Sequence, residues 1–321
     1  MLSSYLFSLD YKDIPDNNQY NSTIYRDKWG VPHIYGKTDK DAAYGLAYAH
    51  AEDDFKTIQQ GYLAGNSLLS DVEGKKALGI DFIAQFIGSD RLYEQKYLSD
   101  VSDEYKSILE AYCEGINRFA EIHPEQVLSK KLFPINTKSL FLYGQLQLFV
   151  SSKGDYWVKK ILKNKLNYEP VKDEVKGSNT FAFNSSKTKD GNTYLAINTH
   201  QPLDGPTSWY EVHLNSEEGT DIIGALFAGS PNVLIGANRD IAWAHTVNIP
   251  DKTDVFALEM HPSKKKYYRV DEEYLKLKKQ RAKLLIKILG IPIKISKRYY
   301  ESIYGPTLKN DSGYYSVRTP S

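Results

Sequence analysis

The chain has 321 residues, of which 41% are hydrophobic and 25% are charged, enough for one large or two ordinary domains. Its 41 Lys and Arg side chains nearly balance 40 Asp and Glu, which argues against nucleic-acid and anionic-membrane partners, because both need a basic excess. Cys113 is the only cysteine, so an intramolecular disulfide is excluded, and no apolar run reaches the ~20 residues that cross a bilayer.

The first elements expected along the chain are a lead-in and a hairpin. Residues 1–22 are polar and rich in Asn, which indicates irregular structure. Two β-like runs follow, Thr23–Arg26 and His33–Tyr35, separated by Trp-Gly-Val-Pro. We therefore expect a β-hairpin over Thr23–Thr38.

A long helix is predicted next. Thr38 and Asp41 have the spacing of a capping box, and apolar residues then recur at helical intervals to about Leu63. The predicted apolar face comprises Ala42, Leu46, Ala49, Phe55, Ile58 and Tyr62. His50 precedes three acidic residues at 52–54, which suggests a metal site, but a polar helix face with a buried histidine is the commoner arrangement. Gly61–Ser70 predicts a turn-rich break.

The strongest helical pattern begins after Ser102. This residue is a good N-cap, and Asp103 and Glu104 place negative charge at the positive end of the helix dipole. Apolar residues then repeat at intervals of three and four: Tyr105, Ile108, Leu109, Tyr112, Cys113, Ile116, Phe119 and Ala120. Because Cys113 falls on this stripe, we expect it to pack in the core rather than act as a nucleophile.

Two further helices are expected before the chain changes character. One covers Lys138 to about Val150 with Thr137 as its N-cap, and a basic one covers Asp155–Lys165. Asn167–Gly177 contains a proline and alternating charges, which favours a flexible segment.

From Ser178 onward the hydrophobic period changes from that of a helix to that of a strand. Strand-like runs occur at Trp209–Leu214, Asp221–Phe227, Asn232–Ile235, Ile241–Val247, Val255–Met260, Leu284–Leu289, Ile293–Ile295 and Tyr314–Val317. Helices followed by many strands indicate an α+β fold rather than alternating βαβ units. We therefore expect a mainly helical segment over 1–177, with its N-terminal hairpin, and a β-rich segment over 178–321.

The start of the β-rich segment carries the most specific chemistry. Asn-Thr-Phe-Ala-Phe after Ser178 alternates as a strand does, and a second run, Thr193–Asn198, follows an Asp-Gly turn signal. If the Gly177–Ser178 peptide is cut, Ser178 gains an α-amine, which titrates near ~7.7–8.0 and can act as the base for the adjacent hydroxyl. Gly177 leaves the scissile carbonyl uncrowded because it has no Cβ. Gly-Ser-Asn alone is common turn chemistry.

Motifs on both sides of Ser178 resemble one family. The motifs are Arg26-Asp27-Lys28-Trp29-Gly30-Val31-Pro32-His33-Ile34, Gly45-Leu46-Ala47-Tyr48-Ala49-His50-Ala51-Glu52-Asp53, Gly177-Ser178-Asn179, Asn198-Thr199-His200, Trp209-Tyr210-Glu211-Val212-His213-Leu214, Gly236-Ala237-Asn238 and Ile241-Ala242-Trp243-Ala244-His245-Thr246-Val247. Their order and spacing are similar to those of the penicillin acylase family of N-terminal nucleophile hydrolases. His200 and His245-Thr246-Val247 resemble the acyl-homoserine-lactone and cephalosporin acylase branch more than the penicillin G branch.

This resemblance implies a fold and a reaction. The family has an αββα sandwich, in which two antiparallel sheets lie between helical layers. An inactive precursor cleaves itself, the α and β chains assemble, and the exposed serine removes the acyl group from a small-molecule acyl-amide substrate without a catalytic cofactor. The family is usually periplasmic or secreted, whereas Met1–Asp10 lacks the basic n-region and full apolar core of a signal peptide.

The resemblance also implies roles for single residues. Ser178 matches the nucleophile, and Gly177 and Ser178 flank the autoprocessing bond. His200 matches the position whose backbone helps to hold the nucleophile's amine and hydroxyl, although a loop histidine is often a plain surface residue. Val247 matches the position whose backbone N–H is one half of the oxyanion hole, and losing such a donor typically costs about 10²–10³ in rate.

Several neighbouring residues are expected to line or support the site without a catalytic role. Gln201, Leu203 and Leu234 are expected to line the acyl pocket. His245 is expected to support the site from a strand end, and His213 and Trp209 are expected to be core or wall residues.

A calcium site is left open. Asp251, Thr253 and Asp254 have the spacing at which some family members bind Ca²⁺ through two carboxylates and a carbonyl. Two carboxylates are too few to specify calcium, which takes about 6–8 oxygens. A structural calcium site and a metal-free acidic loop are therefore both compatible with the sequence.

The sequence departs from the family in one respect. The family's second oxyanion donor, an asparagine, and an arginine near the α-amine come from far downstream in a longer β-chain, and no arginine after Ser178 lies in a matching motif. The sequence is therefore expected to be the N-terminal portion of such an enzyme.

The main hypothesis is an N-terminal-serine amidohydrolase. A truncated form or pseudoenzyme that acts as a binding module is the alternative. A Ser-His-Asp hydrolase is disfavoured because the sequence has no Gly-x-Ser-x-Gly motif.

Overall fold

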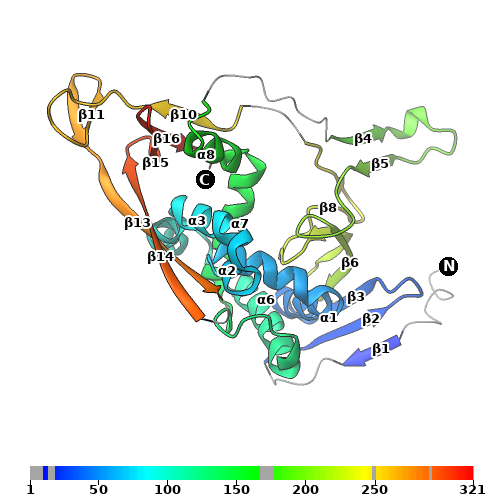
Figure 1. Ribbon diagram of the computed structural model, residues 1–321. Coiled ribbons are helices and arrows are strands. Elements are labelled where there is room, and N and C mark those ends of the chain that lie inside the picture. The colour runs from blue at the N-terminus through cyan, green and yellow to red at the C-terminus, as the bar shows by residue number, and fades with distance from the viewer. Residues whose placement is uncertain (1–9, 14–18, 167–176, 248–250, 289–290, 321) are drawn as a thin grey trace. The chain divides into compact units, whose positions relative to one another are not determined.

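The computed structural model describes residues 10–13, 19–166, 177–247, 251–288 and 291–320. Every α-helix among them ends at or before Leu162, and strands dominate from Ser178 onward (Figure 1). The molecule is therefore a mixed helical and sheet structure with the expected order of elements. The chain divides into two compact units whose bounds differ from those of the predicted segments. One unit comprises 1–61, 101–137 and 173–249, and the other comprises 62–100, 138–172 and 250–321. The predicted boundary at 177/178 concerns the covalent chain and is not tested by this division.

The first unit is built on a seven-stranded sheet with the order β1-β2-β3-β6-β7-β8-β9. Its strands are β1 Asp10–Asp13, β2 Ser22–Arg26, β3 Pro32–Gly36, β6 Trp209–Ser216, β7 Asp221–Phe227, β8 Ile235–Ala237 and β9 Ala242–Trp243. Neighbouring strands are antiparallel except β3 and β6, which are parallel with His33 opposite His213. That parallel pair joins strands from opposite sides of Ser178 into one sheet.

Helix α1 (Asp39–Gly65) begins at the predicted capping box. The Thr38 Oγ1 accepts the Asp41 N–H at 3.2 Å, and Asp41 Oδ2 accepts the Thr38 N–H at 2.8 Å. The helix is interrupted at Asp54, whose backbone is non-helical and whose carboxylate accepts the Thr57 N–H at 3.2 Å. Asp54 therefore caps the second half of the helix. All six residues of the predicted apolar face are buried.

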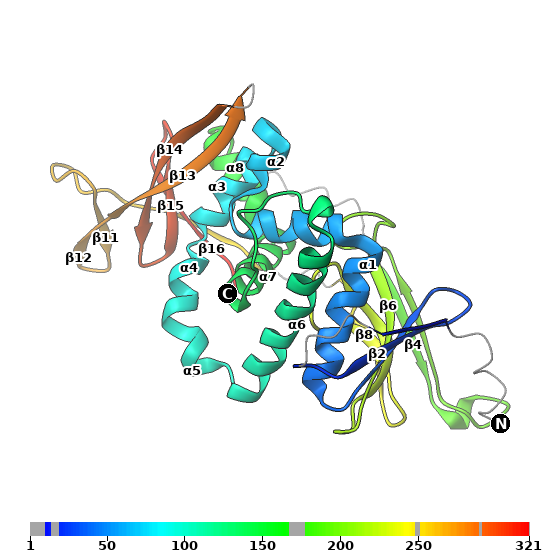
Figure 2. The same ribbon diagram turned by 90° about the horizontal axis from the view of Figure 1, so that it is seen from below.

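Helix α6 (Asp103–Ile122) lies beside α1 (Figure 2). The Tyr105 N–H donates to the Ser102 side chain at 3.2 Å, which confirms the predicted N-cap. A Cβ added to Gly115 would lie 2.3 Å from the Tyr44 carbonyl oxygen, so glycine permits the close approach of the two helices. Burial raises the pKa of Cys113 to about 12, and the thiol packs in the core as expected.

The second unit contains most of the remaining helices. They are α2 Leu69–Glu73, η1 Gly74–Ala77, α3 Leu78–Phe86, α4 Ser89–Leu92, η2 Tyr93–Tyr97, α5 Leu98–Asp100, α7 Thr137–Ser151 and α8 Gly154–Leu162. Its five-stranded sheet has the order β10-β16-β15-β14-β13, and β11 pairs with β12. These strands are β10 Asp254–Ala257, β11 Tyr267–Val270, β12 Glu273–Lys276, β13 Lys278–Ile288, β14 Ile291–Ser302, β15 Gly305–Lys309 and β16 Tyr314–Arg318.

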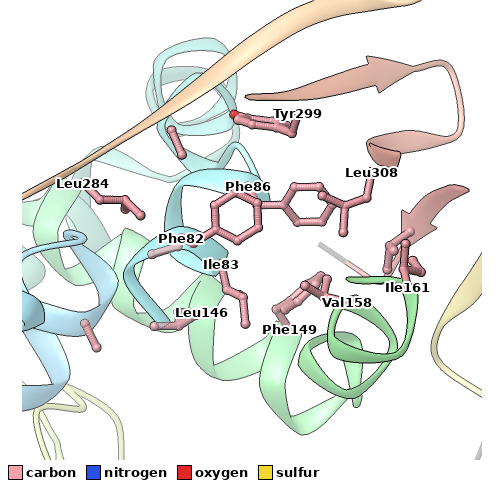
Figure 3. Close-up of a cluster of buried hydrophobic side chains, with 14 residues drawn as sticks. Phe82, Ile83, Phe86, Leu146, Phe149, Val158, Ile161, Leu284, Tyr299 and Leu308 are labelled. Atoms are coloured by element: carbon pink, nitrogen blue, oxygen red, sulfur yellow. The ribbon is translucent and has the colours of Figure 1, made fainter. Parts of the chain in front are cut away.

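Figure 3 shows the core of this unit, in which aromatic side chains of α3 meet the sheet. The rings of Phe86 and Tyr299 have centroids 5.4 Å apart, and Phe82 lies 6.3 Å from Tyr299. Phe149 of α7 and Ile161 of α8 belong to the same buried cluster. Residues from both sides of the 177/178 bond therefore share this core.

Several sequence predictions are wrong in detail. The lead-in contains strand β1, and α1 continues through the break expected at Gly61 as far as Gly65, which packs directly on the backbone of Tyr143. The strand expected over Ile241–Val247 is limited to two residues, and that expected over Asn232–Ile235 starts at Ile235. The segment expected to be flexible, 167–177, lies outside the described residues except for Gly177.

A polar network also connects the two sides of the 177/178 bond within the first unit. Arg26 of β2 donates to Asp53 at 2.8 Å and to Glu52 at 3.1 Å, both on α1. The Tyr210 hydroxyl of β6 donates to the same Asp53 oxygen at 2.7 Å. Burial, with Asp53 as a further cause, raises the pKa of Tyr210, so its hydroxyl remains a donor. The acidic residues near His50 thus have protein partners, and His50 itself is buried, as predicted for a polar helix face with a buried histidine.

The parallel β3–β6 pair also carries a histidine pair. His33 Nδ1 and His213 Nδ1 are 3.0 Å apart, and His213 Nε2 lies 3.0 Å from an Asp221 carboxylate oxygen. Because that carboxylate accepts the Nε2–H, His213 Nδ1 is the acceptor and His33 Nδ1–H the donor. Burial, followed by the proximity of His213, lowers the pKa of His33.

We predict that Arg26→Gln destabilises the protein by about 2 kcal/mol, because Glu52 and Asp53 would keep their partly buried charges without the guanidinium. Urea denaturation at neutral pH measures the effect. Arg239→Gln is the control, since Arg239 is 87% exposed and its ion pair with Asp221 should contribute less than about 1 kcal/mol. Equal losses from the two substitutions would contradict this account.

A second prediction concerns acid lability. Because the pKa of folded His33 lies below 6.5, the unfolded chain binds more protons than the folded protein as the pH falls. The contribution of neutral His33 to the unfolding free energy is therefore complete above that pH and declines as the pH falls through the folded pKa. Contact with His213 lowers the pKa of Asp221, whose effect begins only below about pH 3.8. His33→Gln should therefore flatten the decline in unfolding free energy between about pH 7 and pH 5. An unchanged slope would show that His33 does not titrate in this range.

Candidate active site

Ser178 is the first residue of a separate two-stranded hairpin in the first unit. Strand β4 (Ser178–Phe183) pairs antiparallel with β5 (Tyr194–Thr199), and Ser178 lies opposite Thr199. Both strands form where the sequence predicted them. A register slip of one residue would turn the Ser178 side chain to the other face, so the pairing determines where its hydroxyl points.

The turn of this hairpin is held by side chains of its own. Asn184 accepts the Ser186 N–H at 2.9 Å, and Asp190 accepts the Asn192 N–H at 3.2 Å. The Tyr194 hydroxyl also donates to Asp190, and this contact, with the Asn192 donors, lowers the pKa of Asp190 to about 2. Gly191 has a φ of +73°, which glycine adopts without strain. The Asp-Gly turn thus fixes the register at the other end, at Ser178.

The Ser178 hydroxyl lies beside the residue that follows β5. The backbone N–H of His200 donates to Ser178 Oγ at 3.4 Å, a long hydrogen bond. The Asn179 amide nitrogen lies 3.3 Å from His200 Nε2. The His200 ring is exposed, so its main contribution to Ser178 is through the backbone. A backbone donor at this oxygen can orient the hydroxyl.

Gly177 precedes the hairpin without a packing reason for being glycine. A Cβ added there would meet no atom within 4 Å, and its φ lies outside the left-handed range. The fold therefore does not require glycine at this position. Because glycine has no Cβ, it leaves the Gly177 carbonyl accessible, which is a chemical reason for glycine at this position.

The other predicted site residues are less closely associated with Ser178. Gln201 is half-buried beside His200, whereas Leu203 is 95% exposed. Leu234 is half-buried, and its N–H donates to the Ala225 carbonyl at 2.9 Å. Val247 is 52% exposed and lies outside β9. Within the described part of the chain, no hydrogen bond joins Val247 or these pocket candidates to Ser178, and their roles stay predictions.

Among the described residues, the other predicted residues, His245, His213 and Trp209, form no hydrogen bond with Ser178. His245 is exposed, and His213 belongs to the β3–β6 pair described above. Trp209 stacks on Phe227 of the neighbouring strand at 4.3 Å. Sequence reasoning gave no role to Asn179, although its position directly after the candidate nucleophile was a signal that could have found its contact with His200.

The candidate calcium residues lie in the second unit. Asp251 and Asp254 are exposed, and Thr253 is buried with its hydroxyl donating to the Ser152 carbonyl. Asp251 accepts the Thr253 N–H at 3.5 Å. Among the described residues, no three His, Cys, Asp or Glu side chains gather as a metal site would require. Two carboxylates and one carbonyl supply fewer than the about 6–8 oxygens that calcium takes, so calcium stays a prediction with no part in the chemistry below.

The comparisons with known proteins agree with the motifs around this site. The family model described as penicillin amidase matches residues 21–320, so the chain belongs to that family. An acyl-homoserine lactone acylase PvdQ of Pseudomonas fluorescens is 23% identical over 97% of this chain and 45% of its own length. The acyl-homoserine lactone acylase QuiP of Pseudomonas aeruginosa is 22% identical over 91% of this chain and 40% of its own length. The chain thus spans less than half the length of these relatives.

Solved structures with some similarity include penicillin G acylases. A thermostable penicillin G acylase from Alcaligenes faecalis is 24% identical, with a TM-score of 0.36, and the match covers 43% of this chain and 25% of that chain. The family assignment therefore rests on the sequence match.

Proposed function

We propose that this protein is an amidohydrolase that uses Ser178 as an N-terminal nucleophile. The observation that carries the proposal is the position of Ser178: it follows Gly177, opens β4, and its Oγ accepts the His200 N–H. Membership in the penicillin amidase family supports hydrolysis of an acyl amide. The relatives named acyl-homoserine lactone acylases support an acyl group on a small amine as the substrate class.

The reaction begins with self-cleavage in this proposal. Ser178 Oγ attacks the Gly177 carbonyl carbon, the peptide C–N bond breaks, and the acyl group moves from nitrogen to oxygen. Water then hydrolyses this ester, which leaves Gly177 with a carboxylate and Ser178 with a free α-amine. The strands on both sides of the cut remain paired through β3 and β6, so the α and β segments stay assembled.

Substrate turnover uses the new α-amine as the base. The neutral amine takes the proton of the Ser178 hydroxyl as Oγ attacks the amide carbonyl, and that proton passes to the departing amine. The acyl group remains on Oγ until water, activated by the same amine, releases it as a carboxylic acid. We propose the Val247 N–H as one oxyanion donor, Gln201, Leu203 and Leu234 as parts of the acyl pocket, and the αββα sandwich as the complete fold.

We predict that Ser178→Ala abolishes self-cleavage and amidase activity together, because it removes the attacking atom. Ser178→Cys should allow some cleavage, since a thiol can attack, but turnover should fall at least 100-fold or so. Intact-mass spectrometry and a chromogenic acyl-amide panel measure the two effects, in the 321-residue protein and in any longer form that its gene encodes. Amidase activity in Ser178→Ala would place the nucleophile elsewhere.

The hydrogen bond from the His200 N–H to Ser178 Oγ leads to a separate prediction. His200→Ala keeps the backbone N–H that reaches Ser178 Oγ and should change the self-cleavage rate less than about tenfold. His200→Pro removes that N–H and should slow cleavage by about 10²-fold or more, a loss like that of one oxyanion donor. Circular dichroism controls for folding. Similar rates in the two variants would show that the His200 backbone does not position the nucleophile.

A further inference from the structure

A long basic hairpin in the second unit has a charge distribution that the fold does not require. Residues 274–300 contain nine Lys and Arg and no Asp or Glu, although the whole chain has a formal net charge of +1. Strands β13 and β14 pair over Lys278–Ile288, whereas β14 pairs with β15 only at Tyr300–Ser302. The rest of the hairpin therefore extends beyond the sheet (Figure 1).

The pairing register separates the cations by face. Arg281 lies opposite Arg298, Lys283 opposite Ser296, and Leu285 opposite Lys294. Directly opposed residues of an antiparallel pair share a face, as do residues two apart on one strand. The cationic face thus comprises five exposed side chains: Lys279, Arg281, Lys283, Lys294 and Arg298.

The cationic face is not neutralised within the described residues. None of its five side chains forms a salt bridge in that part of the chain. The nearby charges of Arg298 and Arg281 lower the pKa of Lys279, which shows mutual repulsion on this surface. A direct Arg–Arg cross-strand pair is destabilising for the hairpin itself. Lysines do discourage pairing at sheet edges, but that need does not explain an arginine pair or the absence of acids.

The opposite face is anchored at one end and exposed at the other. Ala282 and Leu284 are buried in the core of the unit, and the Gln85 side chain of α3 bonds both the N–H and the carbonyl of Lys283. Farther along, Ile293 and Ile295 are each 40% exposed. The distal half of the hairpin therefore presents cations on one side and aliphatic side chains on the other.

We propose that the β13–β14 hairpin docks on an anionic phospholipid membrane by lying in the interfacial layer, with the cationic face among the headgroups and Ile293 and Ile295, on the other face, towards the acyl chains. An amphipathic element with a basic face and an aliphatic face is what such a surface binds. A single-stranded nucleic acid would favour exposed aromatic groups for stacking, whereas Tyr300, the aromatic residue of the cationic face, is 6% exposed. No helix among the described residues is long and apolar enough to span a bilayer. The proposal does not depend on amidase activity.

Co-sedimentation of the intact chain with vesicles tests the proposal. Binding is expected to phosphatidylcholine vesicles containing about one third phosphatidylglycerol and not to pure phosphatidylcholine, and it should weaken strongly between about 0.1 M and 1 M salt, as the Debye length shortens. The triple variant Arg281→Gln/Lys283→Gln/Arg298→Gln should bind roughly 100-fold more weakly, at about fivefold per cation.

Two matched variants control for net charge and for side-chain shape. Lys75→Gln/Lys163→Gln/Lys165→Gln removes the same charge from exposed positions of the same unit and should bind as the unmodified protein does. Arg281→Lys/Arg298→Lys keeps the charge and should also retain binding.

The aliphatic face is tested by a separate variant. Ile293→Thr/Ile295→Thr keeps strand propensity and should weaken binding several-fold, because it removes exposed aliphatic surface.

Three outcomes would overturn the proposal. They are no sedimentation of the unmodified protein with anionic vesicles at low salt, equal binding by the two triple variants, and tighter binding to a short DNA duplex than to the vesicles. Thermal melts establish that each variant is folded, and the salt dependence of the unmodified protein tests the proposal without any substitution.

Discussion

The parallel pairing of β3 with β6 is the contact on which the first unit depends. It joins three strands from before Ser178 to four from after it, so one sheet is completed only when both parts of the chain are present. Side chains reinforce the joint: the Ser216 and Thr220 hydroxyls both donate to Asp39 Oδ1, at 2.6 and 2.7 Å, at the start of α1. Parallel pairing between distant segments is costly in chain entropy, and these local contacts offset part of that cost.

The same interweaving explains how a cut at Ser178 is compatible with a stable fold. Each compact unit takes residues from both sides of the 177/178 bond, as the shared core of α3, α7 and β14 illustrates. The hairpin that carries Ser178 stands apart from the seven-stranded sheet, and its own turn sets its register. Cleavage at its first residue would therefore remove none of the contacts that hold either unit together.

What the sequence could predict was governed by the range of the interactions. The capping box at Thr38, the N-cap at Ser102 and the hairpin at Ser178 depend on residues within a few positions of one another, and all three are confirmed. The β3–β6 pair joins residues 180 positions apart, and no local pattern indicates it. The N-cap residues of α2 and α4 make no side-chain hydrogen bond and these helices are four to five residues long, so they give no terminal signal.

Charge distribution escaped the sequence reasoning for a related reason. The near-zero net charge argued against anionic partners, but it averages over a hairpin that has only basic residues. Register, which places Arg281 opposite Arg298, was needed to reveal a face. At Ile241–Val247 the alternating pattern predicted a strand that is too long. A β-like pattern forms a strand only as far as a partner strand pairs with it, and β8 pairs with β9 only at Ala242 and Trp243.

The most direct test of this account is to cut the chain within 167–176 by an inserted protease site and analyse it by native size exclusion. Both pieces should elute together as one folded species and separate only in denaturant, because the two units are built across the junction. Two pieces that separate under native conditions would contradict the claim that β3–β6 pairing and the shared cores hold the parts together.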